Sequence, residues 1–363
     1  MKRKIDQVIE NNATLANSGS SLLLNPLTAP IMKSFSTLVI CLLVSCAAFA
    51  APLEDAPKGG NSLFDRWAKQ ETLSISLYIN MDSLEINRSS ADFLPATVLA
   101  GGEELALEVA VRGRFRRRTC EMPPMKLKFA KAGLRALGLN THNDFKLVTH
   151  CTSDEAGRDA LLREQLAYEL YGTINPAASF RTQLLSVTYV NTADGTTEEN
   201  VAILIEDYDE LQDRLALDNC KDCYNATADE ITNAEEVALF QYMIGNADYC
   251  NTMLRNLKLM TNEAGEKTLV PYDFDFSGLV NADYASVDAQ FGQTDVTDRL
   301  LKWSFAADCD LTAATAKFLA HQDTLLAQVE NYPGLKKASK REITKYLKGF
   351  FRELAKGTIA PAK

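Results

Sequence analysis

The sequence predicts an α+β fold in which strands dominate the first half and helices dominate the second. Runs of alternating apolar and polar residues are typical of half-buried strands. They occur at 73–79, 105–111, 125–129 and 145–149. A broad apolar face at helical spacing predicts a helix over about 155–171. Two further strands are expected at 184–190 and 201–205.

Helical patterns take over after residue 207. We expect helices at about 208–216, 231–246, 297–306, 311–331 and 338–356, and a small hairpin of two strands at 256–260 and 268–271. The order of elements therefore predicts two lobes: a β-rich N-terminal lobe at 63–207 and a mostly helical C-terminal lobe at 208–363. This order matches the bilobal fold of protein kinases.

Composition places the chain among soluble globular proteins. Its 363 residues are 46% hydrophobic and 24% charged, which excludes collagen, coiled coil and wholesale disorder. The formal net charge is −10. An acidic protein does not attract nucleic acid over its whole surface, so we expect no nucleic-acid partner.

The first fifty residues predict export. Lys33 precedes an apolar run at 38–44, and the segment ends in Ala48-Phe49-Ala50, so residues 32–50 resemble a secretory signal peptide. Residues 1–31 are a polar upstream segment, which indicates a start codon assigned too early, and residues 51–62 read as a linker. The expected location is the periplasm, the outer membrane or the outside of the cell. A lipobox-like sequence around Cys46 makes a lipoprotein the alternative to a freely secreted protein.

Six cysteines follow the signal segment, and an even number in an exported chain permits disulfides. Cys220 and Cys223 have the spacing of a redox or zinc motif. There is no second such pair and the three histidines are scattered, so loop closure or unpaired thiols are favoured over zinc. His150 and Cys151 lack an accompanying acid, which argues against thiol catalysis.

Two basic segments stand out from the acidic background. Five arginines lie within 112–118, either as a solvated loop or as a phosphate-binding or polyanion-binding segment. Residues 336–363 hold nine basic and two acidic groups, and the helix expected there has lysines opposite its apolar stripe. A docked terminal helix with a solvated face is favoured, and contact with a membrane or another anionic surface is the alternative.

The densest group of chemically active residues lies in the helical half. Asp248 follows a buried helix, Asn256 comes eight residues later, and Asp273 and Asp275 follow the hairpin. Phosphoryl transfer uses a carboxylate for the attacking hydroxyl, and an Asn and a carboxylate for Mg²⁺. Phosphate also needs a cation, and Lys126 or Lys128 on a first-lobe strand would supply it.

Several motifs resemble the CotH (spore-coat protein H) kinase family of atypical, secreted or surface-bound kinases, and they keep the family's order. They are Arg112-Gly113-Arg114, Pro123–Phe129, Phe145–Val148, Leu162-Arg163, Ile203–Tyr208 and Val270–Asp275. The resemblance runs from about residue 105 to about residue 300. It departs from the family at Glu121-Met122-Pro123, and where Phe145 and Tyr272 stand in place of tryptophan.

The resemblance implies a kinase that uses ATP and Mg²⁺. It makes Asp248 the catalytic residue, Asn256 and Asp273 metal ligands, and Asp275 a second metal candidate. Lys128, or else Lys126, would contact the phosphates and pair with a helix glutamate, Glu164 or Glu169. Glu206 would lie at the crossover between the lobes, near the nucleotide base.

Two functions from different classes are compatible with these residues. The first is an exported kinase that phosphorylates a protein or another hydroxyl-bearing acceptor. The second is a catalytically silent, kinase-shaped envelope protein that binds a partner or a polysaccharide. The second predicts that Asp248, Asn256 and Asp273 do not converge, or that side chains plug the cleft between the lobes. Isolated Asp and Asn residues also cap helices and stabilise turns, so only their convergence indicates a site.

Overall fold

The computed structural model of the chain describes residues 61–90, 92–221, 223–305 and 308–362. All of these residues belong to one unit, Glu54–Lys363. The expected signal segment 32–50, Cys46 and most of the linker 51–62 lie outside the described residues.

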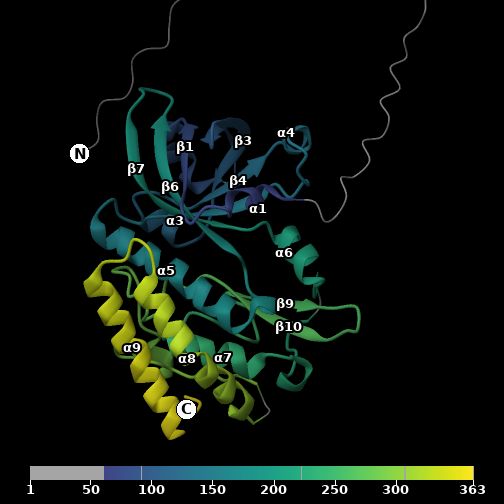
Figure 1. Cartoon of the computed structure of the whole chain (residues 1–363), viewed down its shortest axis with the longest axis vertical. Coiled ribbons are helices and arrows are strands. Elements are labelled where there is room, and N and C mark those ends of the chain that lie inside the picture. The colour runs from purple at the N-terminus through teal and green to yellow at the C-terminus, as the bar shows by residue number, and fades with distance from the viewer. Residues whose placement is uncertain (1–60, 91, 222, 306–307, 363) are drawn as a thin grey trace, which may run out of the picture. The chain divides into compact units, whose positions relative to one another are not determined.

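Seven strands of the first half close into a barrel (Figure 1). They are β1 (Leu73–Ile79), β2 (Leu94–Ala100), β3 (Glu103–Val111), β4 (Met125–Phe129), β5 (Asp144–Thr149), β6 (Thr182–Asn191) and β7 (Thr197–Ile205). The order around the barrel is β1-β2-β3-β4-β5-β7-β6. Neighbouring strands run antiparallel except for β6 and β1, whose parallel pairing closes the barrel.

The alternating pattern of the strands separates two cores. Leu77, Phe129 and Phe145 point into the barrel and are almost fully buried. The opposite faces of β5 and β7 carry Val148 and Ile203, which pack into the core of the helical half instead. Side chains on the outer face of β5 therefore lie between the barrel and the helices.

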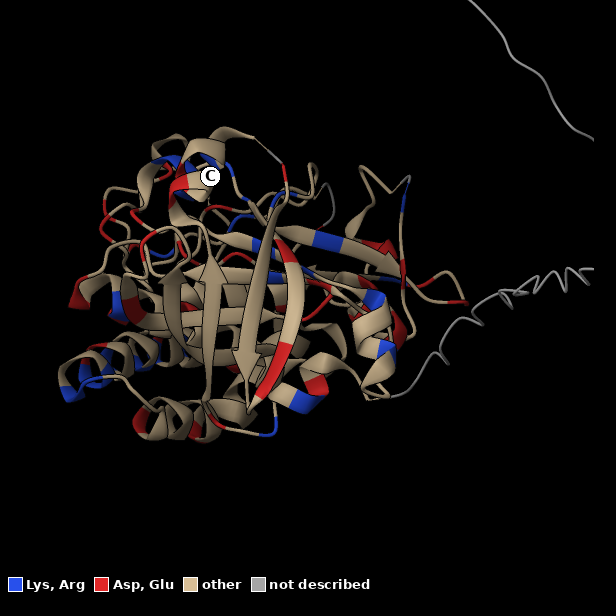
Figure 2. Cartoon of the chain, turned by 90° about the horizontal axis from the view of Figure 1, so that it is seen from above, with Lys and Arg blue, Asp and Glu red and all other residues tan. Residues whose placement is uncertain are grey.

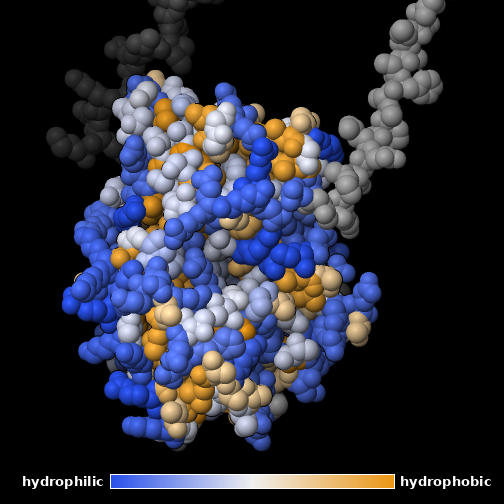
Figure 3. All heavy atoms as spheres, in the orientation of Figure 1, coloured by the Kyte–Doolittle hydropathy of each residue, from blue (hydrophilic) through white to orange (hydrophobic). Residues whose placement is uncertain are grey.

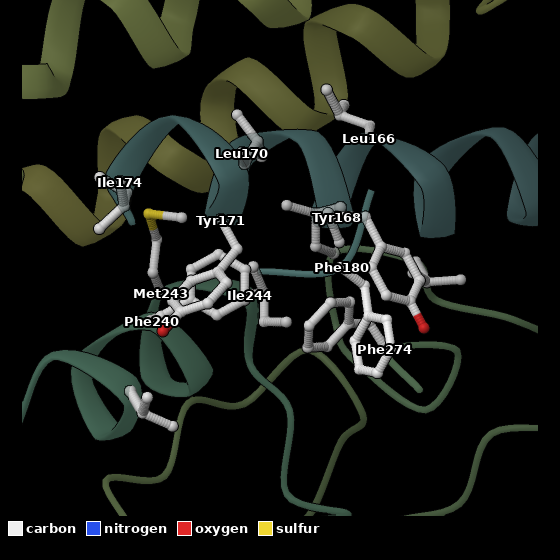
Figure 4. Packing of buried hydrophobic residues seen from close by; sticks show 14 of the residues in the cluster. Leu166, Tyr168, Leu170, Tyr171, Ile174, Phe180, Phe240, Met243, Ile244 and Phe274 are labelled. Carbon is white, nitrogen blue, oxygen red and sulfur yellow. The ribbon is translucent and has the colours of Figure 1, made fainter. Parts of the chain in front are cut away.

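The helix α5 (Glu155–Ile174) joins the barrel to the helical half. It begins at Asp154, whose Oδ1 accepts a hydrogen bond from the Gly157 amide at 3.0 Å. Figure 4 shows its buried face packed against α7 (Ala234–Ile244) and against Phe180 and Phe274. The rings of Tyr168 and Phe274 lie 4.7 Å apart, which joins α5 to the segment after the hairpin.

The other elements surround this framework. The remaining α-helices are α1 (Leu63–Trp67), α2 (Met81–Ile86), α3 (Arg116–Thr119), α4 (Lys131–Ala136), α6 (Tyr208–Leu215), α8 (Thr312–Asn331) and α9 (Lys337–Lys356). Short 3₁₀ helices lie at Asn87–Ser89, Pro176–Ala178, Ala228–Glu230 and Ala289–Phe291. A second sheet has the order β10 (Lys267–Pro271), β9 (Leu257–Thr261), β8 (Asp218–Asn219).

The chain is thus a mixed α and β protein with strands first and helices second. The structure adds a feature that was not predicted and contradicts one expected helix. The closure of the strands into a barrel was not predicted, because it depends on the long-range pairing of β1 with β6. The helix expected at 297–306 is wrong over the part of that segment that is described. Arg299 donates to the carbonyls of Met243 and Tyr346, and these contacts hold the irregular segment against α7 and α9.

Disulfides join Cys120 to Cys151 and Cys220 to Cys223. The first links the loop after β3 to the end of β5. Cys250 and Cys309 are not disulfide-bonded.

The charged residues lie mainly outside the strands. In Figure 2 the long strands are mostly uncharged, while both signs of charge occur on helices and loops. Figure 3 shows a face that is mainly hydrophilic, with hydrophobic residues in separate groups. α9 buries Ile343, Leu347 and Phe350 and exposes the basic residues opposite, as a docked terminal helix does. Contact of this helix with an anionic surface stays a prediction. None of the described helices is both long and apolar enough to span a membrane.

The barrel core predicts a clear difference between two leucines. Leu77 is 0% exposed inside the barrel, whereas Leu99 is 38% exposed. Leu77→Ala leaves a cavity and is expected to lower the free energy of unfolding by about 2–5 kcal/mol. Leu99→Ala is expected to change it by no more than about 0.5 kcal/mol. Denaturant unfolding measures both, and equal effects of the two substitutions would contradict the assignment of the barrel interior.

Candidate functional site

Asp248 is positioned by the end of a buried helix. α7 stops at Gly245, whose φ of 65° lies in the left-handed region that glycine adopts without strain. Buried Asn246 then bridges the turn: its Nδ2 donates to Gln241 Oε1 at 3.0 Å and its Oδ1 accepts from the Asp248 amide at 2.9 Å. Gly245 and Asn246 are therefore structural, and they present the Asp248 side chain.

Asn256 lies directly against Asp248. Its Nδ2 donates to the Asp248 carboxylate oxygen Oδ2 at 3.0 Å and to the Asp248 carbonyl at 2.6 Å. This orientation turns the amide oxygen of Asn256 away from Asp248. Arg255 Nε lies 3.4 Å from the other carboxylate oxygen. Burial, together with the charge of Asp273, raises the pKa of Asp248, and Arg255 and Asn256 oppose that rise.

Asp273 follows β10 in a rare backbone conformation. Its φ is 64°, and that of Asn256 is 56°. Asp and Asn are the non-glycine residues that adopt this region most readily, and such outliers cluster at functional sites. The Asp273 amide donates to Tyr168 Oη of α5 at 2.9 Å, and the Tyr272 amide donates to the Asn256 carbonyl at 3.1 Å. These two hydrogen bonds hold the hairpin exit, the residues that follow β10, against both α5 and the loop that runs from Asp248 to Asn256.

Lys146 faces this group from the outer side of β5. Its ammonium lies 5.2 Å from the ring centre of Phe180 and 5.3 Å from that of Tyr272. Burial, with the neighbouring charges of Arg112 and Lys258, lowers the pKa of Lys146 to about 8, and Asp273 acts in the opposite direction. A partly buried cation with a depressed pKa next to Asp273 is typical of a functional site.

Arg116 forms the other side of the site. Its Nη1 lies 2.9 Å from Glu164 Oε2 on α5 and 3.8 Å from Asp275 Oδ2, and its Nη2 donates to the Thr149 carbonyl at the end of β5. Burial raises the pKa of both Glu164 and Asp275, with Asp275 well above its ordinary value, and Arg116 opposes that rise. Asp275 also accepts from Tyr284 Oη at 3.1 Å.

The lysine and glutamate expected to pair do not meet. Glu164 pairs with Arg116 instead, and Glu169 is exposed on α5. Lys126 lies on the same face of the barrel as Lys146, directly across from it, and forms an ion pair with Asp144 at 2.6 Å. Lys128 is exposed, and its ammonium lies 5.2 Å from the ring centre of Phe93. Of these lysines, Lys146 is the one that faces Asp273, and the sequence reasoning did not single it out.

Glu206 lies at the crossover between β7 and α6, as expected, but its carboxylate is used internally. It is 0% exposed. Arg181 and Arg214 each approach both of its oxygens through backbone or side-chain nitrogens, at 2.7–3.2 Å. We therefore assign Glu206 to the packing of this crossover rather than to ligand contact.

The donor set fits Mg²⁺ better than a metal held wholly by protein. Among the residues that the structure describes, no three His, Cys, Asp or Glu side chains come together as a metal site. Mg²⁺ prefers one or two carboxylates completed by water and substrate phosphates. The Asp273 carboxylate and the amide oxygen of Asn256 would be the protein donors of such a partial set. Asp275 fits less well because Tyr284 and Arg116 already engage it.

A cavity of about 640 Å³ opens beside Asp248. Residues 247–251 form one wall, and Ser286–Phe291 and Lys302–Ser304 form others. Asp248 therefore lies between the group around Asp273 and a space large enough for part of a substrate.

No protein-family model and no curated protein matches the chain. Among solved structures, the chain is similar to the Helicobacter pylori proinflammatory kinase CtkA at 10% sequence identity and a TM-score of 0.35. That match covers 68% of this chain and 90% of the other chain. The assignment of site residues rests on the geometry described above.

The depressed pKa of Lys146 predicts that this lysine lowers stability. Its pKa is about 8 in the folded protein against 10.5 ordinarily, so the unfolded chain binds the proton more tightly. The destabilisation is complete below pH 8 and disappears as the pH rises towards 10.5. Lys146→Met is therefore expected to raise the free energy of unfolding by about 2–3 kcal/mol at pH 7.

Lys128→Met is the matched control, because Lys128 is an exposed lysine of the neighbouring strand, and it is expected to change stability by less than about 0.5 kcal/mol. Denaturant unfolding at pH 7 and at pH 10.5 gives both values. A loss of stability in Lys146→Met at pH 7 would show that the lysine is stabilised where it lies.

Proposed function

We propose that this chain is a phosphotransferase that moves the terminal phosphoryl group of ATP to a hydroxyl of a protein or another acceptor, with Mg²⁺. The single observation that carries the proposal is the convergence of Asp248, Asn256 and Asp273. Hydrogen bonds join the first two, and the Tyr272 amide ties Asn256 to the residue before Asp273. The alternative of a catalytically silent protein predicts that these residues lie apart or that side chains plug the cleft. The contact of Asn256 with Asp248 and its tie to the residue before Asp273 argue against the first of these and support the proposal.

Each residue has a role in this reaction that its surroundings support. Asp248 accepts a hydrogen bond from the acceptor hydroxyl and orients it, and its raised pKa suits the receipt of a proton. Lys146 and Arg112 supply positive charge for the phosphates from the barrel side. Asp273 and the amide oxygen of Asn256 would hold Mg²⁺, which neutralises phosphate charge when it is bound.

The transfer balances with these groups. The acceptor oxygen forms a bond to the γ-phosphorus, and the bond from that phosphorus to the β–γ bridging oxygen breaks. The electron pair of the broken bond leaves with ADP, and the hydroxyl proton passes to Asp248. Positioning and charge stabilisation do most of the work in such reactions.

Thermal unfolding with ATP and Mg²⁺ tests the proposal. A ligand that binds only the folded state at a hundred times its Kd stabilises it by about 2.7 kcal/mol, so the wild-type Tm is expected to rise by several degrees. Asp273→Asn is expected to remove that rise, because the amide is a poorer ligand. Asn also tolerates a positive φ, so the fold is kept.

Asp323→Asn is the control, since Asp323 is exposed on α8, and it is expected to keep the full rise. A wild-type Tm that does not respond to ATP, GTP or ADP with either Mg²⁺ or Mn²⁺ would overturn the proposed function.

A further inference from the structure

The cavity beside Asp248 has an apolar rim that the transfer reaction itself does not require. Three of the large hydrophobic residues exposed on the described surface line it: Met253 is 67% exposed, Phe291 42% and Val287 39%. The aromatic residues Phe276 and Trp303 also line the cavity. Exposed apolar residues gathered around one concave site are typical of a binding surface, because water contact with them is unfavourable.

A partly buried ion pair fixes the walls of the cavity. Lys302 is 8% exposed, and its Nζ donates to the Ala247 carbonyl at 2.7 Å and to Asp288 Oδ2 at 2.9 Å. The ammonium also lies 4.4 Å from the centre of the Phe291 ring. Tyr249 Oη closes the set by donating to the Lys302 carbonyl at 2.8 Å. The loop that carries Phe291 is therefore attached directly to the loop that carries Asp248.

This attachment fixes the position of the Asp248 carboxylate relative to the apolar ring of Phe291. Asp248 and Phe291 belong to walls of the same cavity, and Lys302 contacts both Ala247, which precedes Asp248, and Phe291 itself. Lys302 and Asp288 neutralise each other at the wall, and the apolar residues Met253, Val287 and Phe291 line the cavity beside Asp248. Met253 continues that surface outward to solvent, so an occupant extends beyond the cavity.

We propose that the cavity holds a bulky apolar side chain of a peptide acceptor, next to the residue whose hydroxyl Asp248 orients. The acceptor class is thus a polypeptide segment in which Ser, Thr or Tyr has a large apolar neighbour. This inference rests on the proposed function for the role of Asp248, and the binding part of it requires no nucleotide.

Trp303 offers a direct readout. The chain has two tryptophans, and Trp67 is 5% exposed in the barrel core. In a Trp67→Phe background, the emission of Trp303 reports on the cavity. Two heptapeptides with a central serine are titrated, identical except for Phe or Gly beside the serine. The Phe peptide is expected to change the emission and to bind at least about tenfold more tightly than the Gly peptide.

Two variants test whether the preference for the Phe peptide depends on the cavity. Phe291→Ser is expected to abolish most of the preference for the Phe peptide. Tyr224→Ser is the control, because Tyr224 is equally an exposed aromatic residue but does not line the cavity, and it is expected to keep the preference. Equal affinity for the two peptides, or a preference that survives Phe291→Ser, would overturn the inference.

Failure here is distinguishable from failure of the proposed function. The titrations contain no nucleotide, and the Tm shift with ATP and Mg²⁺ contains no peptide. A Tm shift without a preference for the Phe peptide would support the phosphotransferase proposal and overturn the apolar acceptor site. A preference for the Phe peptide without any Tm shift would support the cavity as a peptide-binding site and overturn the proposed phosphoryl transfer.

Discussion

The buried guanidinium of Arg116 is the interaction on which the rest of the site depends. It joins three segments that are distant in sequence, through the Thr149 carbonyl, Glu164 and Asp275. A buried cation is costly unless it is paired, so these contacts must form together. The disulfide between Cys120 and Cys151 closes the same region covalently. Barrel, connecting helix and hairpin exit are thereby held in one arrangement.

That arrangement accounts for the strained backbone at the centre of the site. Asp273 has a positive φ, and its backbone amide donates a hydrogen bond to Tyr168 Oη. Tyr168 lies on α5, the helix that Arg116 contacts through Glu164. Asn256 has a positive φ as well and orients Asp248. Such conformations persist when the surroundings over-determine them. The buried face of α5 and the aromatic packing behind it supply that support, and they hold Asp273 where its charge acts on Lys146.

Part of this was predictable from the sequence, and the limits have physical causes. Asp248, Asn256 and Asp273 could be grouped as site candidates from the sequence, because chemistry restricts their residue types and because helix and hairpin patterns place them at element ends. Lys146 was missed because alternation gives two faces of a strand without saying which face meets the helices. Arg116 was missed for a related reason: five arginines looked alike, and only tertiary packing buries one of them. The barrel closure likewise depends on a pairing between distant strands.

The most direct test of the central claim is the anomalous scattering of Mn²⁺ in crystals grown with a non-hydrolysable ATP analogue. The site described here predicts a manganese peak at the Asp273 carboxylate and the Asn256 amide oxygen, with phosphate density on the side of Lys146. Manganese and nucleotide bound at other residues, or nucleotide bound with no metal at Asp273, would contradict it.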